Sequence, residues 1–544
     1  MNFRELLKEK KLIFFDGAMG TSLQPYLPPG SPPEILNLTS PQRVKEVHLS
    51  YLKEGVDVIE TNTFGANRIK LDKSGLLSNK LKEINYNGVK IAKEVASSQF
   101  VGVSVGPLGS LIQPWGDITV NQALEVFKEQ IEIVAEAGAD LIVIETMASL
   151  KEAKIAAVAA RKVCTLPVVC QLTFEEKGKT LFGTDTRTAA FALQALDVDV
   201  VGANCSVGPK EMFFIAKNMV PFTVKPLIFQ PNAGRAYLKD GKTLFPVGPD
   251  EFSQWMREIA QQGARIIGGC CGTTSAHIAA MIHRAKDVFI PPKKYSILRG
   301  FSSRTRVYSF EGKDSLLLGV NLSSSFIQRE SLDKISDLLS FVAEKGCSFL
   351  NLSLRGENKK FNVGRFVNFI QQSVDIGISI DTDEGSLLEE GLAEIEGRSL
   401  VFLSLQNKED VLKIAREWGA TLGFNIYLES KVDIKKEFEK VIEKCRQIGV
   451  KNLREIAVKI DFPPLKKCNF SLKEKILEIK KIKSHIPTNV ILNLDKLSEE
   501  VADLDFLEEF LLELINLHSV EGVILNFTGI DSYFSALNSL KEFE

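Results

Sequence analysis

The chain has 544 residues, of which 44% are hydrophobic and 25% charged, and its formal net charge is −2. This is an ordinary globular composition, and the small net charge argues against binding to nucleic acid through bulk charge. The apolar runs are short and interrupted, so no membrane span is predicted, and the first ten residues lack the apolar core of a signal peptide. Eight cysteines without an export signal favour a cytoplasmic protein whose thiols are free or bind a metal.

The first 290 residues alternate apolar runs with amphipathic segments such as 121–137 and 150–163. Most of the apolar runs are continuous and rich in Val, Ile and Leu, as expected for parallel strands buried on both faces. The eight strand candidates are residues 12–18, 56–64, 100–107, 139–146, 166–174, 198–206, 226–234 and 264–272. Eight strand–helix units predict an α/β fold of the (β/α)8 TIM-barrel type. A doubly wound parallel sheet is the competing α/β fold.

The alternation lapses over residues 291–312, which contain Pro291, Pro292 and several basic residues. We interpret this segment as a linker between domains. A second alternation follows, with strand candidates at residues 315–323, 348–354, 377–382, 399–405, 420–428, 456–464, 488–494 and 520–527. The sequence therefore predicts two TIM barrels in tandem, one over residues 1–290 and one over residues 313–544.

Three cysteines stand where predicted strands of the first barrel end. Cys205 lies at the end of the run 198–206, and Cys270 and Cys271 lie in the glycine-rich segment 268–274. The active sites of TIM barrels lie at the carboxyl ends of the strands, so these thiols are expected at one mouth. Three thiolates suit a Zn²⁺ that keeps its fourth position open, and the glycines allow the sharp turn that two adjacent ligands need. The alternative is three unrelated small core residues.

Such a site has a definite chemical use. A free thiol has a pKa near 8.5 and is mostly protonated at neutral pH, whereas a metal-bound thiol is deprotonated. An open zinc position would therefore hold a substrate thiol as its thiolate. This zinc-bound substrate thiolate is then the nucleophile, and no separate protein nucleophile is needed. The chemistry points to alkyl transfer to sulfur.

Four motifs of the first barrel, in this order, resemble the signature of homocysteine S-methyltransferases: DGAMGT at 16–21, TNTFGA at 61–66, GANCSVGP at 202–209 and GGCCGTT at 268–274. The resemblance covers residues 1–288. It implies a zinc-bearing TIM barrel that methylates homocysteine to methionine. By position, the zinc ligands implied are Cys205, Cys270 and Cys271.

The same resemblance implies how the amino acid part of homocysteine is held. The carboxylate of Glu145 would pair with the ammonium group, and the backbone N–H groups of Gly17 and Ala18 would hold the carboxylate. For Glu145 a helix cap or a structural acid is the alternative. Asp16 either orients the first loop or is a plain turn residue. Asn204 either lines the pocket or satisfies backbone groups at its strand end.

The second half resembles, more weakly, the pterin-binding barrel of cobalamin-dependent methionine synthases, through GISIDT at 377–382 and IDFPP at 460–464. It departs from that pattern at Asn351, where an acid is usual, and keeps only Asn493 of a Ser- and Asn-rich segment. By this resemblance Asp381 and Asp461 would bond to the N–H edge of a pterin. The alternative is a degenerate barrel that serves as a scaffold.

The methyl donor stays open at this point. The sequence has no Asp-x-His-x-x-Gly, the motif expected of a cobalamin-carrying domain. We therefore expect a methylated corrinoid (methylcobalamin) to arrive on a separate protein, or methyltetrahydrofolate to act through cobalamin. A sulfonium donor such as S-methylmethionine is the first alternative. The others are a fusion with a methylenetetrahydrofolate reductase-like barrel that binds FAD, and a non-catalytic scaffold that docks a corrinoid protein.

Overall fold

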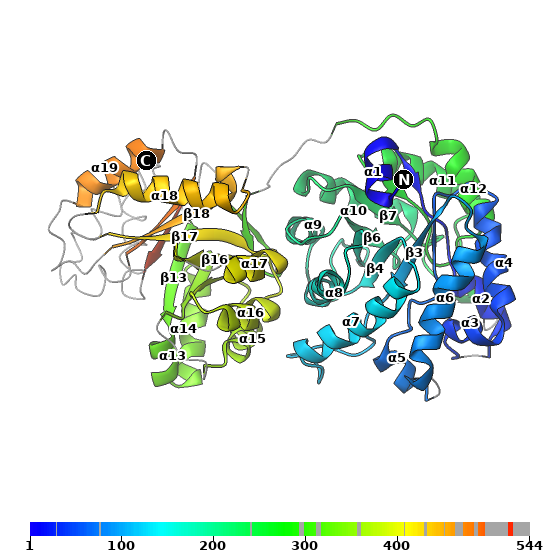
Figure 1. Ribbon diagram of the computed structural model, residues 1–544, viewed down its shortest axis with the longest axis horizontal. Coiled ribbons are helices and arrows are strands. Elements are labelled where there is room, and N and C mark those ends of the chain that lie inside the picture. The colour runs from blue at the N-terminus through cyan, green and yellow to red at the C-terminus, as the bar shows by residue number, and fades with distance from the viewer. Residues whose placement is uncertain are drawn as a thin grey trace. The chain divides into compact units, whose positions relative to one another are not determined.

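The computed structural model describes residues 1–28, 30–75, 78–239, 242–292, 299–311, 317–355, 361–406, 409–428, 432–450, 452–462, 472–483, 488–494 and 521–525. The chain divides into two compact units, Met1–Leu298 and Arg299–Glu544. Each unit has eight parallel strands with helices around them, so the predicted pair of TIM barrels is confirmed (Figure 1). Residues 293–298 and 312 of the predicted linker, and the outer ends of the strand candidates 315–323, 456–464 and 520–527, lie outside the described residues.

The first barrel closes through its first and second strands. Its sheet runs in the order β1-β10-β7-β6-β5-β4-β3-β2, and an isolated parallel bridge between Phe15 and Val58 joins the two ends. Every strand overlaps the run predicted for it. The strands are β1 (Ile13–Phe14), β2 (Val58–Glu60), β3 (Phe100–Val105), β4 (Leu141–Met147), β5 (Val168–Leu172), β6 (Val200–Asn204), β7 (Leu227–Gln230) and β10 (Ile266–Ile267).

The helices of this unit begin at capping residues that the sequence supplies. Thr119 and Gln122 form a capping box at α7, and Ser149 caps α8. The helices are α1 (Phe3–Glu9), α2 (Gly20–Leu23), α3 (Leu36–Thr39), α4 (Pro41–Leu52), α5 (Arg68–Lys73), α6 (Leu81–Val95), α7 (Val120–Glu136), α8 (Leu150–Val163), α9 (Thr186–Leu193), α10 (Pro209–Met219), α11 (Pro249–Gln261) and α12 (Ser275–Ala285). A hairpin, β8 (Tyr237–Lys239) and β9 (Lys242–Leu244), follows β7 and was not predicted.

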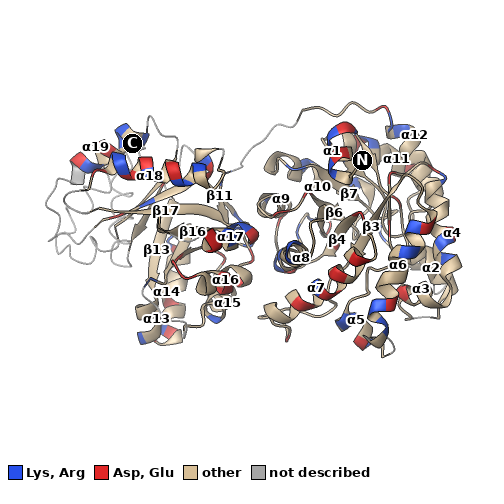
Figure 2. Cartoon of the chain, viewed as in Figure 1, with Lys and Arg blue, Asp and Glu red and all other residues tan. Residues whose placement is uncertain are grey.

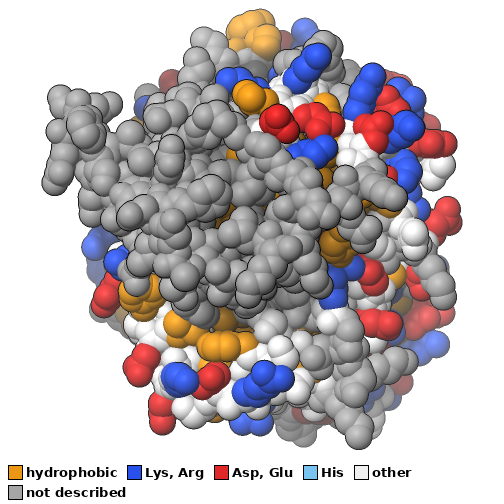
Figure 3. Space-filling view, turned by 90° about the vertical axis from the view of Figure 1, so that its left-hand side faces the viewer, with side chains coloured by type: hydrophobic (Ala, Val, Ile, Leu, Met, Phe, Trp, Pro, Cys, Tyr) orange, Lys and Arg blue, Asp and Glu red, His pale blue; other side chains and the backbone are white. Residues whose placement is uncertain are grey.

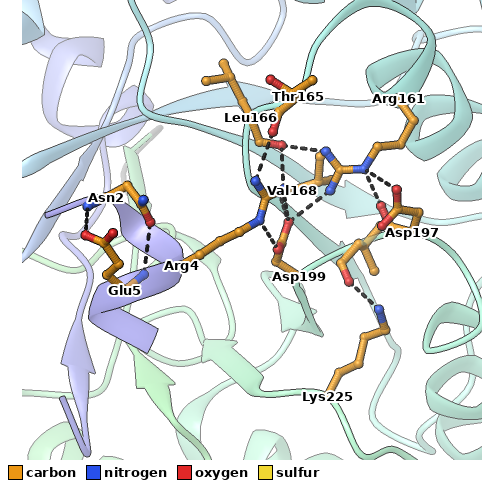
Figure 4. A network of polar contacts seen from close by, with 11 residues as sticks. Asn2, Arg4, Glu5, Arg161, Thr165, Leu166, Val168, Asp197, Asp199 and Lys225 are labelled. Atoms are coloured by element: carbon orange, nitrogen blue, oxygen red, sulfur yellow. Dashed lines mark hydrogen bonds and ion pairs between the residues drawn. The ribbon is translucent and has the colours of Figure 1, made fainter. Parts of the chain in front are cut away.

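The amino end of the first barrel is plugged by α1. Phe3 and Leu6 pack into the apolar core inside the barrel. Arg4 then fixes the helix from outside: its Nε donates to Asp199 Oδ1 at 2.6 Å, and its Nη1 donates to the Thr165 carbonyl at 3.0 Å (Figure 4). Arg161 donates to the other Asp199 oxygen at 2.9 Å. Because Thr165 and Asp199 precede β5 and β6, the plug lies opposite the carboxyl ends of the strands.

The carboxyl ends of the strands carry a layer of polar side chains inside the barrel. Val58, Val143, Val169 and Ile228 belong to the internal apolar core. Side chains alternate along a strand, so the residue two positions further also points inward. Four such residues are polar, and Ser104 and Asn204 lie four positions beyond Phe100 and Val200 of the same core. These six are called the polar layer below: Glu60, Ser104, Glu145, Gln171, Asn204 and Gln230.

The second barrel is closed in sequence order. Its strands are β13 (Leu317–Ser323), β14 (Phe349–Ser353), β15 (Gly377–Asp381), β16 (Leu400–Leu403), β17 (Thr421–Tyr427), β18 (Ala457–Asp461), β19 (Asn489–Asn493) and β20 (Gly522–Leu525). Its described helices are α13 (Ser324–Arg329), α14 (Leu332–Glu344), α15 (Val363–Ser373), α16 (Gly385–Glu394), α17 (Glu409–Glu417), α18 (Ile434–Gln447) and α19 (Leu472–Lys483). Each strand lies within the run predicted for it.

Part of the segment interpreted as a linker is folded. Within residues 291–312, β11 (Gly300–Ser302) and β12 (Val307–Ser309) form an antiparallel pair. Phe301, Tyr308 and Phe310 of this hairpin pack into the core inside the second barrel. The hairpin therefore plugs the amino end of the second barrel, as α1 plugs the first. The basic residues and prolines around it concealed this short apolar alternation.

Charged residues, coloured blue and red in Figure 2, are frequent on outer helices such as α7 and α18. On the face of the second unit seen in Figure 3, the described basic and acidic side chains are interspersed and not separated by sign. Among the described residues, the helices are too short or too polar to span a bilayer.

Candidate functional site

The three predicted metal thiols come together at the carboxyl end of the first barrel. Cys205 follows β6, and Cys270 and Cys271 follow β10. Their sulfur atoms lie within 4.8 Å of one another, and the Sγ atoms of Cys205 and Cys271 are 3.9 Å apart. Two thiolates on a tetrahedral Zn²⁺ with Zn–S bonds of about 2.3 Å would be about 3.8 Å apart. The donor set and its spacing therefore fit zinc.

The backbone at this mouth is held in an uncommon conformation. Thr146, Cys205 and Ser206 have φ values of 59°, 61° and 58°, and they are the non-glycine residues with positive φ in the described part of the chain. Such residues cost about 1–3 kcal/mol each and persist where the surroundings hold them. Here the Cys205 N–H donates to the Gln230 carbonyl at 3.0 Å, and the Thr146 N–H donates to Asn204 Oδ1 at 2.7 Å.

Two glycines beside Cys270 and Cys271 are required by space and by backbone angle. A Cβ on Gly269 would lie 2.4 Å from Thr273 Oγ1. Gly272 has a φ of 78°, and a Cβ there would meet the Phe245 ring at 2.1 Å. Both positions therefore exclude larger residues. The tight turn that they permit directs two adjacent thiols to one point.

The three thiols share protons unequally. Hydrogen bonds from the Cys270 and Cys271 thiols hold the pKa of Cys205 well below its usual value, against the effect of burial. The same contact with Cys205 raises the pKa of Cys271 to about 12 and that of Cys270 well above its usual value. A divalent cation bound by all three sulfur atoms would keep them deprotonated together.

Glu145 lies beside this cluster and is linked to it through one side chain. Ser104 Oγ donates to one oxygen of Glu145, and Asn204 Nδ2 donates to the other at 2.8 Å. Asn204 Nδ2 is also 3.9 Å from Cys270 Sγ. Burial raises the pKa of Glu145 to about 7. The predicted residues Glu145 and Asn204 therefore meet at the thiol cluster, and Asn204 orients the carboxylate besides satisfying the Thr146 backbone.

The first loop approaches the same mouth. The Ala18 N–H donates to Thr273 Oγ1 at 3.1 Å, and the Tyr51 hydroxyl donates to the Ala18 carbonyl at 2.9 Å. The Gly17 N–H has no hydrogen-bond partner among the described residues. Of the two amides predicted to hold a carboxylate, Gly17 is thus the open donor, and Ala18 is engaged with Thr273.

Asp16 and Glu60 are two further buried acids at this mouth. Asp16 Oδ2 accepts from the Glu60 N–H at 3.0 Å, which ties the first loop to β2. Burial raises the pKa of both carboxyl groups well above their usual values, and the nearby Glu145 adds to this rise. Glu60 lies in the predicted strand 56–64, directly before the TNTFGA motif, but it was assigned no role from the sequence alone. Its signal was an acid at an inward-facing position of a buried strand.

The mouth of the second barrel differs in its charges. Asp381 accepts from Arg355 Nε at 2.6 Å, from Asn425 Nδ2 at 3.0 Å and, through its other oxygen, from Lys459. Asp461 Oδ1 accepts from Asn493 Nδ2 at 2.6 Å, whereas its Oδ2 is buried without a partner. Of the two acids predicted for a pterin, Asp381 is already saturated and Asp461 keeps one open oxygen.

Comparison with known proteins identifies the first barrel. A family model described as homocysteine S-methyltransferase matches residues 13–285, about half of the chain. The methionine synthases of Mycobacterium tuberculosis and Mycobacterium leprae are each 28% identical to the chain, over 422 and 427 residues. Both matches cover 72% of this chain and 35% of the relative, so the chain spans about a third of the length of these curated relatives.

Among solved structures, the metallated form of the homocysteine methyltransferase MmuM from Escherichia coli is 24% identical. That match covers 52% of this chain and 99% of MmuM, with a TM-score of 0.45. The family model, by contrast, covers every strand of the first barrel and all three clustered cysteines. The chain therefore belongs to the homocysteine S-methyltransferase family.

Proposed function

We propose that the first barrel transfers a methyl group to the sulfur of homocysteine and so forms methionine, with a Zn²⁺ held by Cys205, Cys270 and Cys271. The observation that carries this proposal is the position of Glu145 beside three thiols that fit zinc. The side chain of Asn204 contacts both the Glu145 carboxylate and Cys270. A single side-chain amide group therefore lies between the carboxylate and the thiols. That spacing suits a small amino acid with a thiol at its far end.

The chain's own residues would bind and orient the substrate. When bound, zinc supplies the Lewis acidity that keeps a thiol deprotonated at neutral pH. Glu145, fixed by Ser104 and Asn204, would pair with the ammonium group. The open N–H of Gly17 would donate to the substrate carboxylate. The Ala18 N–H would donate to it as well only if it shared its hydrogen between the carboxylate and Thr273. These contacts aim the sulfur at the donor methyl.

The reaction itself is a displacement at carbon. The homocysteine thiol first loses its proton to solvent water. Its sulfur then forms a bond to the methyl carbon, while the bond from that carbon to the donor breaks and the donor leaves with the electron pair. The product is a thioether, which binds zinc weakly and can leave the site. No protein nucleophile takes part.

For the donor, we propose a methylated corrinoid on a separate protein, or methyltetrahydrofolate acting through cobalamin. The alignment with the mycobacterial methionine synthases supports this choice, because its 72% of the chain is more than the first unit spans. The alignment therefore extends into the second unit, where Asp461 Oδ2 would be the open acceptor for a pterin N–H. A sulfonium donor, an FAD-binding reductase-like barrel and a non-catalytic scaffold are the alternatives. A cytoplasmic location without a nucleic-acid partner stays a prediction from composition.

Methionine formation by the purified, zinc-loaded chain tests this proposal. Homocysteine is offered with free methylcobalamin, with methyltetrahydrofolate plus cobalamin, and with S-methylmethionine in separate reactions. We expect turnover with methylcobalamin, and with methyltetrahydrofolate as well if the second barrel binds folate. Turnover with the sulfonium alone would mean that the methyl donor is not a corrinoid. Zinc binding without turnover from any donor would favour the scaffold.

A further inference from the structure

A chain of hydrogen bonds crosses the polar layer of the first barrel and ends at Glu60. Gln171 Nε2 donates to Gln230 Oε1 at 2.7 Å, and Gln230 Nε2 donates to Glu60 Oε2 at 2.8 Å. Gln171 and Gln230 are almost fully buried, and Glu60 is 8% exposed. Three strands thus cooperate to hold one carboxyl group in a fixed orientation. None of these three residues has a role in the function proposed above.

The second oxygen of Glu60 is left without a partner. Glu60 Oε1 and Asp16 Oδ1 are both buried and accept no hydrogen bond. Within the described residues, neither Glu60, Asp16 nor Glu145 forms an ion pair. A buried acceptor without a donor is costly, and a buried charge without a counterion more so. These oxygens therefore mark where a donor that the chain does not supply would bind.

The number of these buried carboxyl groups and their negative charge indicate which kind of ligand would fit. Glu145 raises the pKa of both Asp16 and Glu60, and Asp16 raises that of Glu60 further, as close like charges do. A cation with several N–H donors would satisfy them together. An ammonium group has three donors, and one is already expected at Glu145. The partnerless oxygens of Glu60 and Asp16 would accept the other two.

We propose that Glu60, held by Gln230 and Gln171, is a second carboxylate for the ammonium group of homocysteine and selects for thiols that carry an amino group. This inference rests on the function proposed above. Glu60 acts by direct contact, whereas Gln230 and Gln171 are positioning residues. If the ammonium group bonded to Glu145 alone, Glu60 and Asp16 would stay buried beside the substrate without a donor. Bonds from the same ammonium group to their open oxygens remove that difficulty.

The experiment compares three thiols that differ only in their charged groups. Homocysteine carries both groups, 3-aminopropane-1-thiol lacks the carboxylate, and 4-mercaptobutanoate lacks the amine. Their dissociation constants are measured by calorimetry on the zinc-loaded full chain and on Glu60→Gln. Losing a charge-assisted hydrogen bond should weaken both amino-bearing ligands by about 10- to 100-fold. Binding of 4-mercaptobutanoate should stay within about twofold or tighten, because a like charge is removed.

Two further variants separate a specific role from damage to the fold. Gln230→Met removes the donor that orients Glu60, so it should give the same pattern with a loss of about 3- to 10-fold. Glu152→Gln is the matched control, since Glu152 is an equally buried acid of this barrel whose partner is the Leu108 N–H. It should leave all three constants within about twofold.

The outcomes distinguish this inference from its premise. If the unaltered chain binds homocysteine and Glu60→Gln binds it equally well, the inference is overturned and the proposed function stands. Equal weakening of all three thiols would also overturn it, since that pattern indicates general damage. A zinc-loaded chain that binds no homocysteine would overturn the proposed function and this inference together.

Discussion

The two barrels share an architecture but treat buried charge in opposite ways. Both have an apolar plug at the amino end and buried polar side chains in a layer at the carboxyl end. In the first barrel that layer holds acids and adjoins three thiols, with no ion pair to Asp16, Glu60 or Glu145 in the part of the chain described. In the second barrel, Lys459 and Arg355 pair with Asp381, and Lys459 also lies 3.3 Å from Asp461.

We infer from this difference that the first mouth is the one that depends on a ligand. A buried charge is tolerated when its partners are present and costs several kcal/mol when they are not. The second mouth largely supplies its own partners and is nearly complete as a folded structure. The first mouth leaves oxygens and thiols that a metal ion and an ammonium group would complete.

The largest effect is expected at the thiols. Cys205→Ser should lower methionine formation by about 1,000-fold or more, because two of three ligands hold zinc poorly. Zinc content, measured by atomic absorption, should fall from one ion per chain to nearly none. Cys164→Ser, which alters a partly buried thiol outside the cluster, is the control and should keep both zinc and activity. A Cys205→Ser protein that retains zinc would contradict the assignment.

The second mouth should respond through stability. Lys459→Met leaves Asp381 and Asp461 buried without their amine, so the second barrel should lose about 3–5 kcal/mol of unfolding free energy. Trp418 is buried in this unit. In a background with Trp115→Phe and Trp255→Phe, its fluorescence reports urea unfolding of the second barrel alone. Adding Asp381→Asn should restore part of the loss. An unchanged midpoint in Lys459→Met would mean that the pairing is not stabilising.

The same kind of change in the first mouth should act on binding instead. Glu145→Gln should weaken homocysteine binding by about 10- to 100-fold, because a charged partner of the ammonium group is lost. The unfolding free energy of the first barrel should change by about 1 kcal/mol or less, since burial already opposes the charged form. Calorimetry measures the first effect and urea unfolding the second. A Glu145→Gln protein whose first barrel is strongly destabilised but still binds homocysteine normally would contradict the difference inferred between the two barrels.

The smallest effect is a pH dependence of stability at Glu152. Burial raises the pKa of this group to about 7, from an ordinary value near 4.5. A raised carboxyl pKa stabilises the folded state below the unfolded value, and this contribution is lost as the pH rises through about 7. Relative to the unaltered chain, Glu152→Gln should therefore gain about 1–3 kcal/mol between about pH 5 and pH 8. A constant difference across this range would show that Glu152 is not shifted by burial.

Much of the fold could be predicted from the sequence because buried parallel strands have continuous runs of apolar residues. All sixteen barrel strands overlap the predicted runs. The hairpin β11–β12 was missed since its short strands lie among prolines and arginines, and its burial depends on a barrel that forms elsewhere in the chain. Local pattern cannot reveal a segment whose only apolar partner is distant.

The candidate site could be predicted where its residues are of a type with few other uses. Cys205, Cys270 and Cys271 could be recognised because they are cysteines beside glycines at the ends of predicted strands. Glu60 and Gln230 could not, because a single acid or amide in a strand has many uses. Their meaning comes from a hydrogen-bond chain across three strands and from the oxygens left over, which only the assembled barrel displays.

The three thiols are proposed to hold zinc with one position open to the substrate sulfur. X-ray absorption at the zinc edge counts the sulfur neighbours of the metal directly, before and after homocysteine is added to the zinc-loaded chain. The account predicts three sulfur neighbours at about 2.3 Å without homocysteine and four with it. A count that stays the same when homocysteine binds would contradict it.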